Sequence, residues 1–394
     1  MNLKIDRDFT ILTLAELVRI NSINPSLSPE GKGEAEIGAY VADLLNSFGM
    51  QVTTYEIEPA RVNVVGILKG SGGGKSLLMN AHMDTVGVEG MIGDPFGAEI
   101  REGRMYGRGT QDMKGSLAAM LGAVKALADS RVELAGDVLI TAVADEEHAS
   151  IGTDDLVKHV TADAAIVTEP TNLTLCRAHR GFIWYDVETY GRAAHGSRFR
   201  EGIDANMRMG RFLARLDKLE QELRHRPSHP LVGPPSLHAA RLQGGAEISI
   251  YAAHCLLQIE RRTTPGETEK QVTAELQAII DELAAEDTTF KATVKPAFMR
   301  NPFEIGAEAE IVQALEGAMI DCTGAKPIHS GQSFWTDAAI LADTGIESVL
   351  IGPTGGGLHS AEEWVDLRSV VDLAEILAET AVRFCQVSTN PEKP

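Results

Sequence analysis

The sequence contains few cysteines and few cationic residues. Its four cysteines (Cys176, Cys255, Cys322 and Cys385) lie far apart and form no C-x-x-C pair. This spacing excludes a disulfide framework and indicates buried or incidental thiols in a reducing compartment. Only 36 Lys and Arg residues oppose 56 Asp and Glu residues, which gives a formal net charge of −20. Such an acidic chain lacks the basic face that nucleic acids and anionic membranes require, so we expect neither partner.

Long apolar runs and nucleotide-binding loops are also absent. No apolar run is long enough to span a bilayer, and the charges in MNLKIDRDFTILTLAELVRI argue against a signal peptide, so we expect a cytoplasmic protein. GSGGGK lacks P-loop spacing, and no G-x-G-x-x-G follows the first predicted strand, which counts against a dehydrogenase-like α/β protein. A 394-residue chain with 44% hydrophobic residues is globular and large enough for two domains.

Buried strands alternate with helices in the first part of the chain. Continuous apolar stretches at 77–81, 137–144 and 164–168 are typical of strands that are covered on both faces. Apolar residues recur at helical spacing between them, most clearly over 114–130. This alternation predicts an α/β domain with a mainly parallel sheet flanked by helices.

The pattern changes near His179 and changes back after Pro296. Strands expected at 182–190, 236–242, 253–260 and 289–294 alternate with helices over 203–223 and 267–285, which is the ferredoxin-like order. The first pattern then resumes with a helix at 307–319. We therefore predict a catalytic α/β domain formed by residues 1–178 and 297–394, interrupted by an inserted α+β domain over 179–296.

Histidines and carboxylates collect where the predicted strands end. In open α/β sheets the carboxyl ends of the strands share one edge, where ligands bind. The residues that follow strands, or that lie in glycine-rich turns next to helices, are His82, Asp84, Asp112, Glu146, Glu147, Glu169 and His359. We therefore expect two imidazoles and several carboxylates to converge from distant parts of the chain.

Five of these side chains suit a pair of zinc-like ions, which prefer nitrogen and oxygen ligands. Asp112 can bridge the two ions. His82 and Glu169 would then bind one ion, and Glu147 and His359 the other. Three carboxylates and a bridging hydroxide neutralise two dications, which lowers the cost of burying the site.

Glu146 and Asp84 are left over from this ligand set. Glu146 cannot face the same way as its neighbour Glu147, so it is available to take a proton from the attacking water. Asp84 lies two residues beyond His82 and can accept the second ring proton of that histidine. Simpler interpretations exist: a polar strand end with an N-capping aspartate, a solvated Glu-Glu turn, and, for His359, an ordinary loop residue.

In order along the chain, HMDTV, GRGTQDMKG, ADEEHASIGT, TEP and GGGLHSAEEWV resemble the motifs of a family of dinuclear zinc hydrolases. The family includes acetylornithine deacetylase, succinyl-diaminopimelate desuccinylase, aminoacylase and carboxypeptidase G. The resemblance covers nearly the whole chain and implies a zinc-peptidase-like fold. It implies two divalent ions, with zinc as the first choice and cobalt or manganese as alternatives, and a cis peptide bond between Asp112 and Met113. The roles that it implies are ligands at His82, Asp112, Glu147, Glu169 and His359, the general base at Glu146, and a supporting carboxylate at Asp84.

The inserted domain carries two further matches. YGRAAHGS resembles the segment whose histidine, here His195, reaches a neighbouring subunit's site and helps stabilise the oxyanion. The resemblance thus implies a homodimer through an inserted lid and dimerisation domain. Phe199 stands where relatives often have a proline, which changes the local loop. The simpler interpretation of His195 is a surface turn.

Two features resemble substrate-carboxylate contacts in the family. In QIERRTTPGE, Arg262 matches the clamping arginine, with Arg261 as its rival. Gly355 and Gly356 let backbone N–H groups approach the same carboxylate. The simpler interpretations are two exposed arginines on alternating faces and a glycine turn.

The resemblance implies an enzyme of amino-acid metabolism that hydrolyses the amide bond of an N-acyl amino acid, with Glu146 activating a water that bridges two ions. A metallo-exopeptidase acting on short peptides is the alternative within the same chemistry. An alternative of another class is a pseudoenzyme that binds metal or peptide without catalysis.

Overall fold

The computed structural model describes residues 3–130 and 132–387, and contacts within the chain divide it into two compact units. The first unit contains the chain up to Arg177, Ile305–Ser330, and the chain from Thr336 onward. The second unit contains Ala178–Glu304 and Gly331–Trp335. Among the described residues, no helix has the length and apolar character needed to cross a membrane.

A large mixed sheet organises the first unit and also includes Phe303–Glu304 and the ends of two further strands from the second unit. Its strands run in the order β1 (Gln51–Glu58), β2 (Arg61–Leu68), β6 (Val138–Val143), β3 (Leu77–His82), β7 (Ala164–Val167), β15 (Glu347–Leu350), β8 (Leu175–His179) and β13 (Phe303–Glu304), with β14 (His329–Gln332) paired to β8. The middle strands β6, β3, β7 and β15 are parallel. Every residue of β3, β6 and β7 is buried, which explains their continuous apolar sequences.

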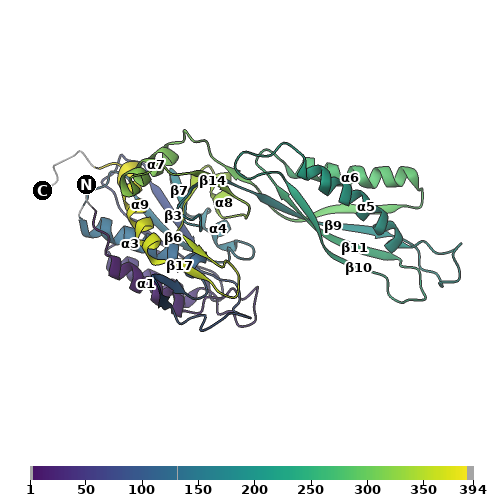
Figure 1. Cartoon of the computed structure of the whole chain (residues 1–394), viewed down its shortest axis with the longest axis horizontal. Coiled ribbons are helices and arrows are strands. Elements are labelled where there is room, and N and C mark those ends of the chain that lie inside the picture. The colour runs from purple at the N-terminus through teal and green to yellow at the C-terminus, as the bar shows by residue number, and fades with distance from the viewer. Residues whose placement is uncertain (1–2, 131, 388–394) are drawn as a thin grey trace. The chain divides into compact units, whose positions relative to one another are not determined.

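Helices pack against this sheet and complete the core. They are α1 (Arg7–Arg19), α2 (Ala35–Ser47), α3 (Gly115–Ser130), α4 (Ile151–Leu156), α7 (Glu310–Thr323), α8 (Ala338–Asp343) and α9 (Leu367–Cys385). Helix α3 contacts α1, α9 and the strands β3 and β6, and α9 also contacts α7 (Figure 1). Buried apolar residues of α1, α2, α3, α7 and α9 form one core with the parallel strands.

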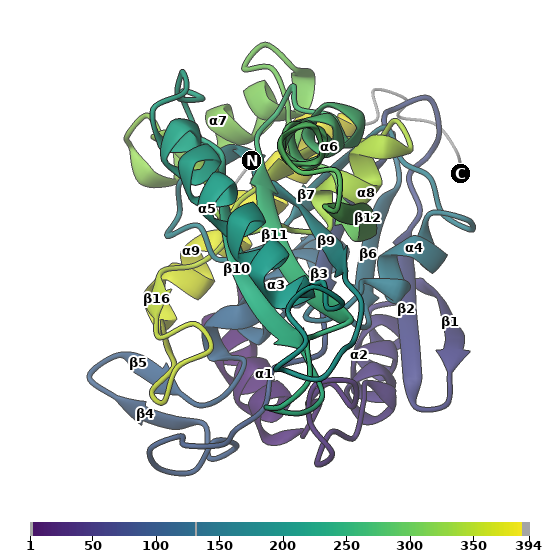
Figure 2. The same ribbon diagram turned by 90° about the vertical axis from the view of Figure 1, so that its right-hand side faces the viewer.

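A small second sheet was not expected from the sequence. It consists of β16 (Gly355–Gly356), β17 (Trp364–Asp366), β5 (Arg104–Tyr106) and β4 (Glu99–Arg101), in that order (Figure 2). These strands have two or three residues each, so they are too short to show an alternating pattern. The sheet joins the segment before Asp112 to the segment after His359.

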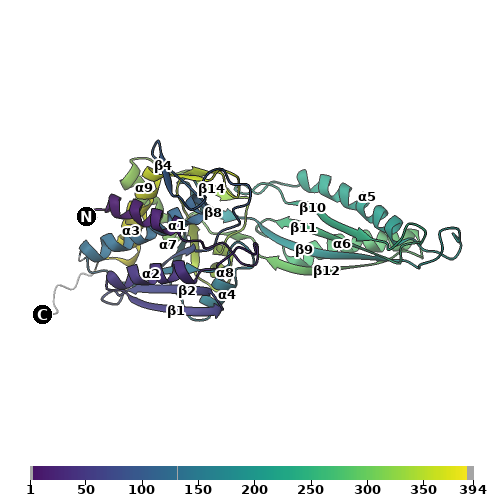
Figure 3. The same ribbon diagram turned by 90° about the horizontal axis from the view of Figure 1, so that it is seen from below.

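The second unit has the predicted strand and helix order. Its elements are β9 (Gly181–Tyr190), α5 (Ala205–Arg224), β10 (Ser236–Gly244), β11 (His254–Thr263), α6 (Glu269–Glu286) and β12 (Lys291–Arg300). The antiparallel sheet runs β10-β11-β9-β12, and α5 and α6 lie side by side along it (Figure 3). The predicted fold class, an α/β unit with an inserted α+β unit, is confirmed.

The second unit extends beyond its predicted end. Strand β12 continues through Pro296 to Arg300, with a register shift between Pro296 and Phe298. Proline is tolerated there because β12 is an edge strand and the bulge removes the need for a ladder hydrogen bond. Gly331–Trp335 also belongs to this unit, although it lies far along the chain.

A buried ion-pair network connects the start of β2 to the end of β6. The guanidinium of Arg61 donates to both carboxylate oxygens of Glu34, at 2.7 and 3.0 Å, and to Asp145 at 2.7 Å. The three side chains are at most 3% exposed. Removing one partner of a buried ion pair leaves an uncompensated charge, which is costly.

We therefore predict that Arg61→Met lowers the free energy of unfolding by about 3–5 kcal/mol, because two buried carboxylates lose their cation. The matched control is Arg368→Met on α9, where the side chain is 86% exposed, and its effect should be about 0.5 kcal/mol or less. Urea unfolding followed by circular dichroism measures both. Equal midpoints for the two variants would contradict the prediction.

Candidate metal centre

The predicted ligands lie at the carboxyl ends of neighbouring parallel strands. His82 is the last residue of β3, Glu147 follows β6, and Glu169 follows β7. These strands are adjacent in the order β6-β3-β7. Asp112 enters from the turn that precedes α3, and His359 from the loop between β16 and β17.

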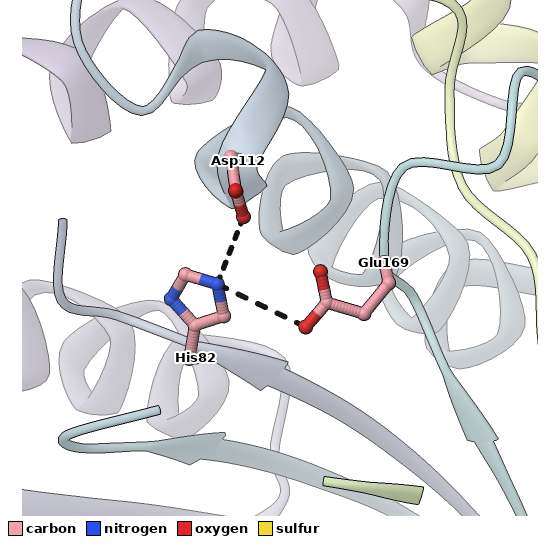
Figure 4. A group of neighbouring side chains, drawn as sticks. All are labelled: His82, Asp112 and Glu169. Carbon is pink, nitrogen blue, oxygen red and sulfur yellow. Dashed lines mark hydrogen bonds and ion pairs between the residues drawn. The ribbon is translucent and has the colours of Figure 1, made fainter. Parts of the chain in front are cut away.

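Two groups of possible metal ligands share one carboxylate. The Nε2 atom of His82 lies 3.0 Å from Oδ1 of Asp112 and 3.9 Å from Oε1 of Glu169 (Figure 4). The Nε2 atom of His359 lies 3.3 Å from Oδ2 of Asp112 and 3.0 Å from Oε2 of Glu147. Within each group, the ligand atoms lie within 4.8 Å of one another. Asp112 therefore offers one oxygen to each group, and the peptide bond that follows it is cis, as the family resemblance implies.

Glu146 lies beside these groups and belongs to neither. Its Oε2 atom is 4.0 Å from Nε2 of His82, whereas its neighbour Glu147 faces His359. The Glu146 side chain is only 11% exposed, so the two glutamates do not form a solvated turn. A buried carboxylate next to the ligands is suited to proton transfer at that site.

Asp84 supports the site differently from the prediction. Nδ1 of His82 is 2.9 Å from the backbone carbonyl oxygen of Asp84 and 3.6 Å from its carboxylate. The carboxylate instead accepts hydrogen bonds from the backbone N–H groups of Glu146 and Glu147, at 3.1 and 3.2 Å. Asp84 thus orients His82 through its main chain and both glutamates through its side chain.

Asn24 also belongs to this support, although it was not among the predicted site residues. Its amide donates to Asp84 at 2.8 Å and to Asp145 at 2.9 Å. Asn24 is therefore a buried link between Asp84 and the Arg61 network. The contact to Asp84 spans 60 residues, so no local sequence pattern signals it.

Burial and the neighbouring charges shift the pKa values of the side chains in the site. Burial raises the pKa of Glu169 well above its usual value, and that of Glu147 to about 7. Burial acts the same way on Asp112, but hydrogen bonds from His359 and His82 outweigh it and hold the pKa of Asp112 below its usual range. Hydrogen bonds to Asp112 and then to Glu147 raise the pKa of His359 to about 10.

These residues fit a pair of divalent cations. The donors are imidazole nitrogens and carboxylate oxygens, which are common zinc ligands. Oε1 of Glu147 is buried without a hydrogen-bond partner among the described residues. Buried carboxylates repel one another, and bound dications compensate that repulsion and reverse the local pKa pattern. His359, whose side chain is 51% exposed, leaves the site accessible from one side.

The remaining predicted residues of the inserted segment lie in the second unit. His195 is near the surface, and its Nδ1 lies 2.8 Å from Oγ and 3.3 Å from the backbone nitrogen of Ser197, so both contacts use the same ring nitrogen. Arg261 is only 1% exposed and pairs with Glu267, so it is not the exposed arginine that the simpler interpretation assumed. Arg262 is 31% exposed, and its Nε lies 2.6 Å from Glu260.

Gly355 and Gly356 form β16 in the first unit. The N–H of Gly355 donates to Oδ1 of Asn172 at 3.3 Å. A Cβ atom at Gly355 would lie 2.4 Å from the carbonyl oxygen of Trp364, and one at Gly356 would lie 2.9 Å from the Trp364 ring. Close packing against Trp364 therefore favours glycine at both positions.

Comparisons with known proteins find similar sequences and structures over most of the chain. A family model described as Peptidase family M20/M25/M40 matches residues 78–383. Acetylornithine deacetylase of Myxococcus xanthus is 30% identical over 331 residues, covering 82% of this chain and 84% of that protein. N-formyl-4-amino-5-aminomethyl-2-methylpyrimidine deformylase of Bacillus subtilis (strain 168) is 29% identical over 392 residues, covering 91% of each. The crystal structure of aminopeptidase PepT from Bacillus cereus ATCC 10987 has the same fold, with a TM-score of 0.80 at 19% identity, covering 97% of this chain and 100% of that one.

We predict that zinc binding to the metal-free protein releases protons. A histidine binds metal through a neutral nitrogen, but the pKa of His359 is raised to about 10, so its ring is protonated at pH 7. Affinity should therefore fall as the pH is lowered. Calorimetric titration in two buffers of different ionisation enthalpy counts the released protons, and His359→Ala should release about one fewer per chain. Equal proton release by the wild-type chain and this variant would contradict the assignment.

Proposed function

This chain belongs to peptidase family M20/M25/M40, and from that premise we propose that it hydrolyses the amide bond of an N-acyl amino acid. The observation that carries the proposal is the pair of ligand groups around Asp112, with Glu146 beside them. We propose zinc as the metal in both groups, with cobalt or manganese as alternatives. The ligands would be His82, Asp112, Glu147, Glu169 and His359.

Two bound divalent ions supply Lewis acidity, which polarises the amide carbonyl and lowers the pKa of water. The chain itself supplies the proton transfer. Burial, followed by the charge of Glu169, raises the pKa of Glu146 well above its usual value, and bound dications would lower it again, so that this carboxylate could accept a proton. Glu146 takes that proton from the attacking water and delivers it to the leaving nitrogen. Asp84 orients Glu146 for this step, because its carboxylate accepts a hydrogen bond from the backbone N–H of Glu146 at 3.1 Å.

The second unit contributes the remaining roles in this proposal. Nε2 of His195 makes neither of the contacts to Ser197 and would donate to the oxyanion that develops on the carbonyl oxygen of the substrate amide. We assign it to the site of a second copy, so that residues 179–296 act as a lid and homodimerisation domain. Arg262 is favoured over Arg261 as the carboxylate clamp, because Arg261 is buried and engaged by Glu267. Gly355 and Gly356 remain a proposed backbone contact to the same carboxylate.

Exopeptidase activity is the second candidate, because the same groups hydrolyse a peptide bond and the fold is shared with an aminopeptidase. The substrates of the two candidates differ on both sides of the cleaved amide bond. They differ in the group that carries the carbonyl and in the group that leaves with the nitrogen. Both differ from a binding protein without catalysis, in which Glu146 would have no function.

A hydrolysis assay with added zinc or cobalt tests the proposal. The panel consists of N-acetyl, N-succinyl and N-formyl amino acids together with dipeptides. We expect turnover of an N-acyl amino acid, and we expect Glu146→Ala to lower kcat about 10²–10⁴-fold while it keeps its metal. Glu282→Ala, whose side chain is 63% exposed on α6, is the control and should retain full activity.

The other outcomes of this assay are equally informative. Turnover of dipeptides alone would establish the exopeptidase instead. A metal-loaded protein that hydrolyses nothing in the panel would favour the pseudoenzyme. Retained activity in Glu146→Ala would contradict the proton-transfer role of Glu146.

A further inference from the structure

Glu363 is a buried carboxylate with no part in the proposed reaction. It follows His359 by four residues, immediately before β17, and it is 1% exposed. Its oxygens accept hydrogen bonds from four donors. Oε1 accepts from the backbone N–H groups of Gln111 and Asp112, at 2.9 and 3.1 Å. Oε2 accepts from the backbone N–H of Gly109 at 3.0 Å and from Arg108 at 2.7 Å.

Arg108 extends this contact to the His359 loop. Besides Glu363, its guanidinium donates to the carbonyl oxygen of Ser360 at 3.2 Å and to that of Gly87 at 3.1 Å. Ser360 is the residue next to His359. The side chains of Glu363 and Arg108 thus bind the turn that carries Asp112 and the loop that carries His359 into one unit.

We propose that Glu363 is a positioning residue that sets the separation of Asp112 and His359, and thereby the metal affinity of the group that contains them. This inference rests on the proposed metal site. Oδ2 of Asp112 and Nε2 of His359 are 3.3 Å apart, although the two residues come from segments far apart in the sequence. The carboxylate of Glu363 binds the backbone of the Asp112 turn, and Arg108 binds the His359 loop at Ser360, so the two segments are held together.

The role requires a carboxylate because each of its oxygens serves two donors. A glutamine has one acceptor oxygen and an NH₂ group that only donates. Whichever way its amide is turned, two of the four donors face another donor, and the turn before Asp112 must shift. Partners of metal ligands typically change metal affinity about 10–100-fold when they are replaced.

The test compares Glu363→Gln with Glu362→Gln in the full chain. Glu362 is the adjacent residue, its side chain is 50% exposed, and its nearest cation is Arg101 at 4.0 Å. Zinc is titrated into each metal-free protein, and cobalt-loaded samples are examined by visible absorption. We expect one of the two binding steps to weaken about 10–100-fold in Glu363→Gln, with an altered cobalt spectrum. Glu362→Gln should match the wild-type chain in both measurements.

A purely structural role would lower the melting temperature of Glu363→Gln but leave both zinc affinities and the cobalt spectrum unchanged, and that result would overturn the inference. If Glu363→Gln does not fold, Arg108→Lys replaces it. This variant keeps the positive charge but cannot reach Glu363, Ser360 and Gly87 together, so the same weakening is expected and wild-type affinity would again overturn the inference. A wild-type chain that binds fewer than two ions would instead refute the proposed metal site.

Discussion

Repulsion among buried carboxylates is the constraint on which the first unit depends. Three neighbouring parallel strands end at the same edge of the sheet and bring acidic side chains together away from water. Burial is the largest of the causes that raise the pKa of Glu147 to about 7 and that of Glu169 well above its usual range. Such a cluster is unfavourable unless cations occupy it, because unpaired charge in a low-dielectric interior is costly. The ligand geometry and the need for metal are therefore two aspects of one arrangement.

The cluster is held by two buried networks on different segments. On one side, Asp84 binds the backbone of the two glutamates and is linked through Asn24 to Asp145 and Arg61. On the other side, the carboxylate of Glu363, just before β17, binds the turn that carries Asp112. Each network pairs its anions with an arginine or with backbone N–H groups. Rigid support of this kind keeps ligands preorganised for metal rather than free to relax apart.

Much of this was predictable because it is local. Apolar runs that end in histidine or acid predicted the buried strands and the convergence of histidines and carboxylates at one sheet edge, and the switch in pattern near His179 predicted the inserted unit. The features that the sequence did not predict depend on contacts between residues distant in sequence or on very short strands. The strands β4, β5, β16 and β17 are too short to alternate, and the contact from Glu363 to Gln111 spans 252 residues. Pro296 did not end its strand because a bulge at a sheet edge accommodates it. The orientation of His82 by a main-chain carbonyl has no sequence signature.

The central claim is that one carboxylate, Asp112, serves two metal ions. Anomalous diffraction from crystals grown with zinc tests it most directly, because it locates the ions independently of activity. The account predicts two anomalous peaks in each chain, about 3.5–4 Å apart, with one oxygen of Asp112 bound to each. A single peak, or two peaks that do not share Asp112, would contradict it.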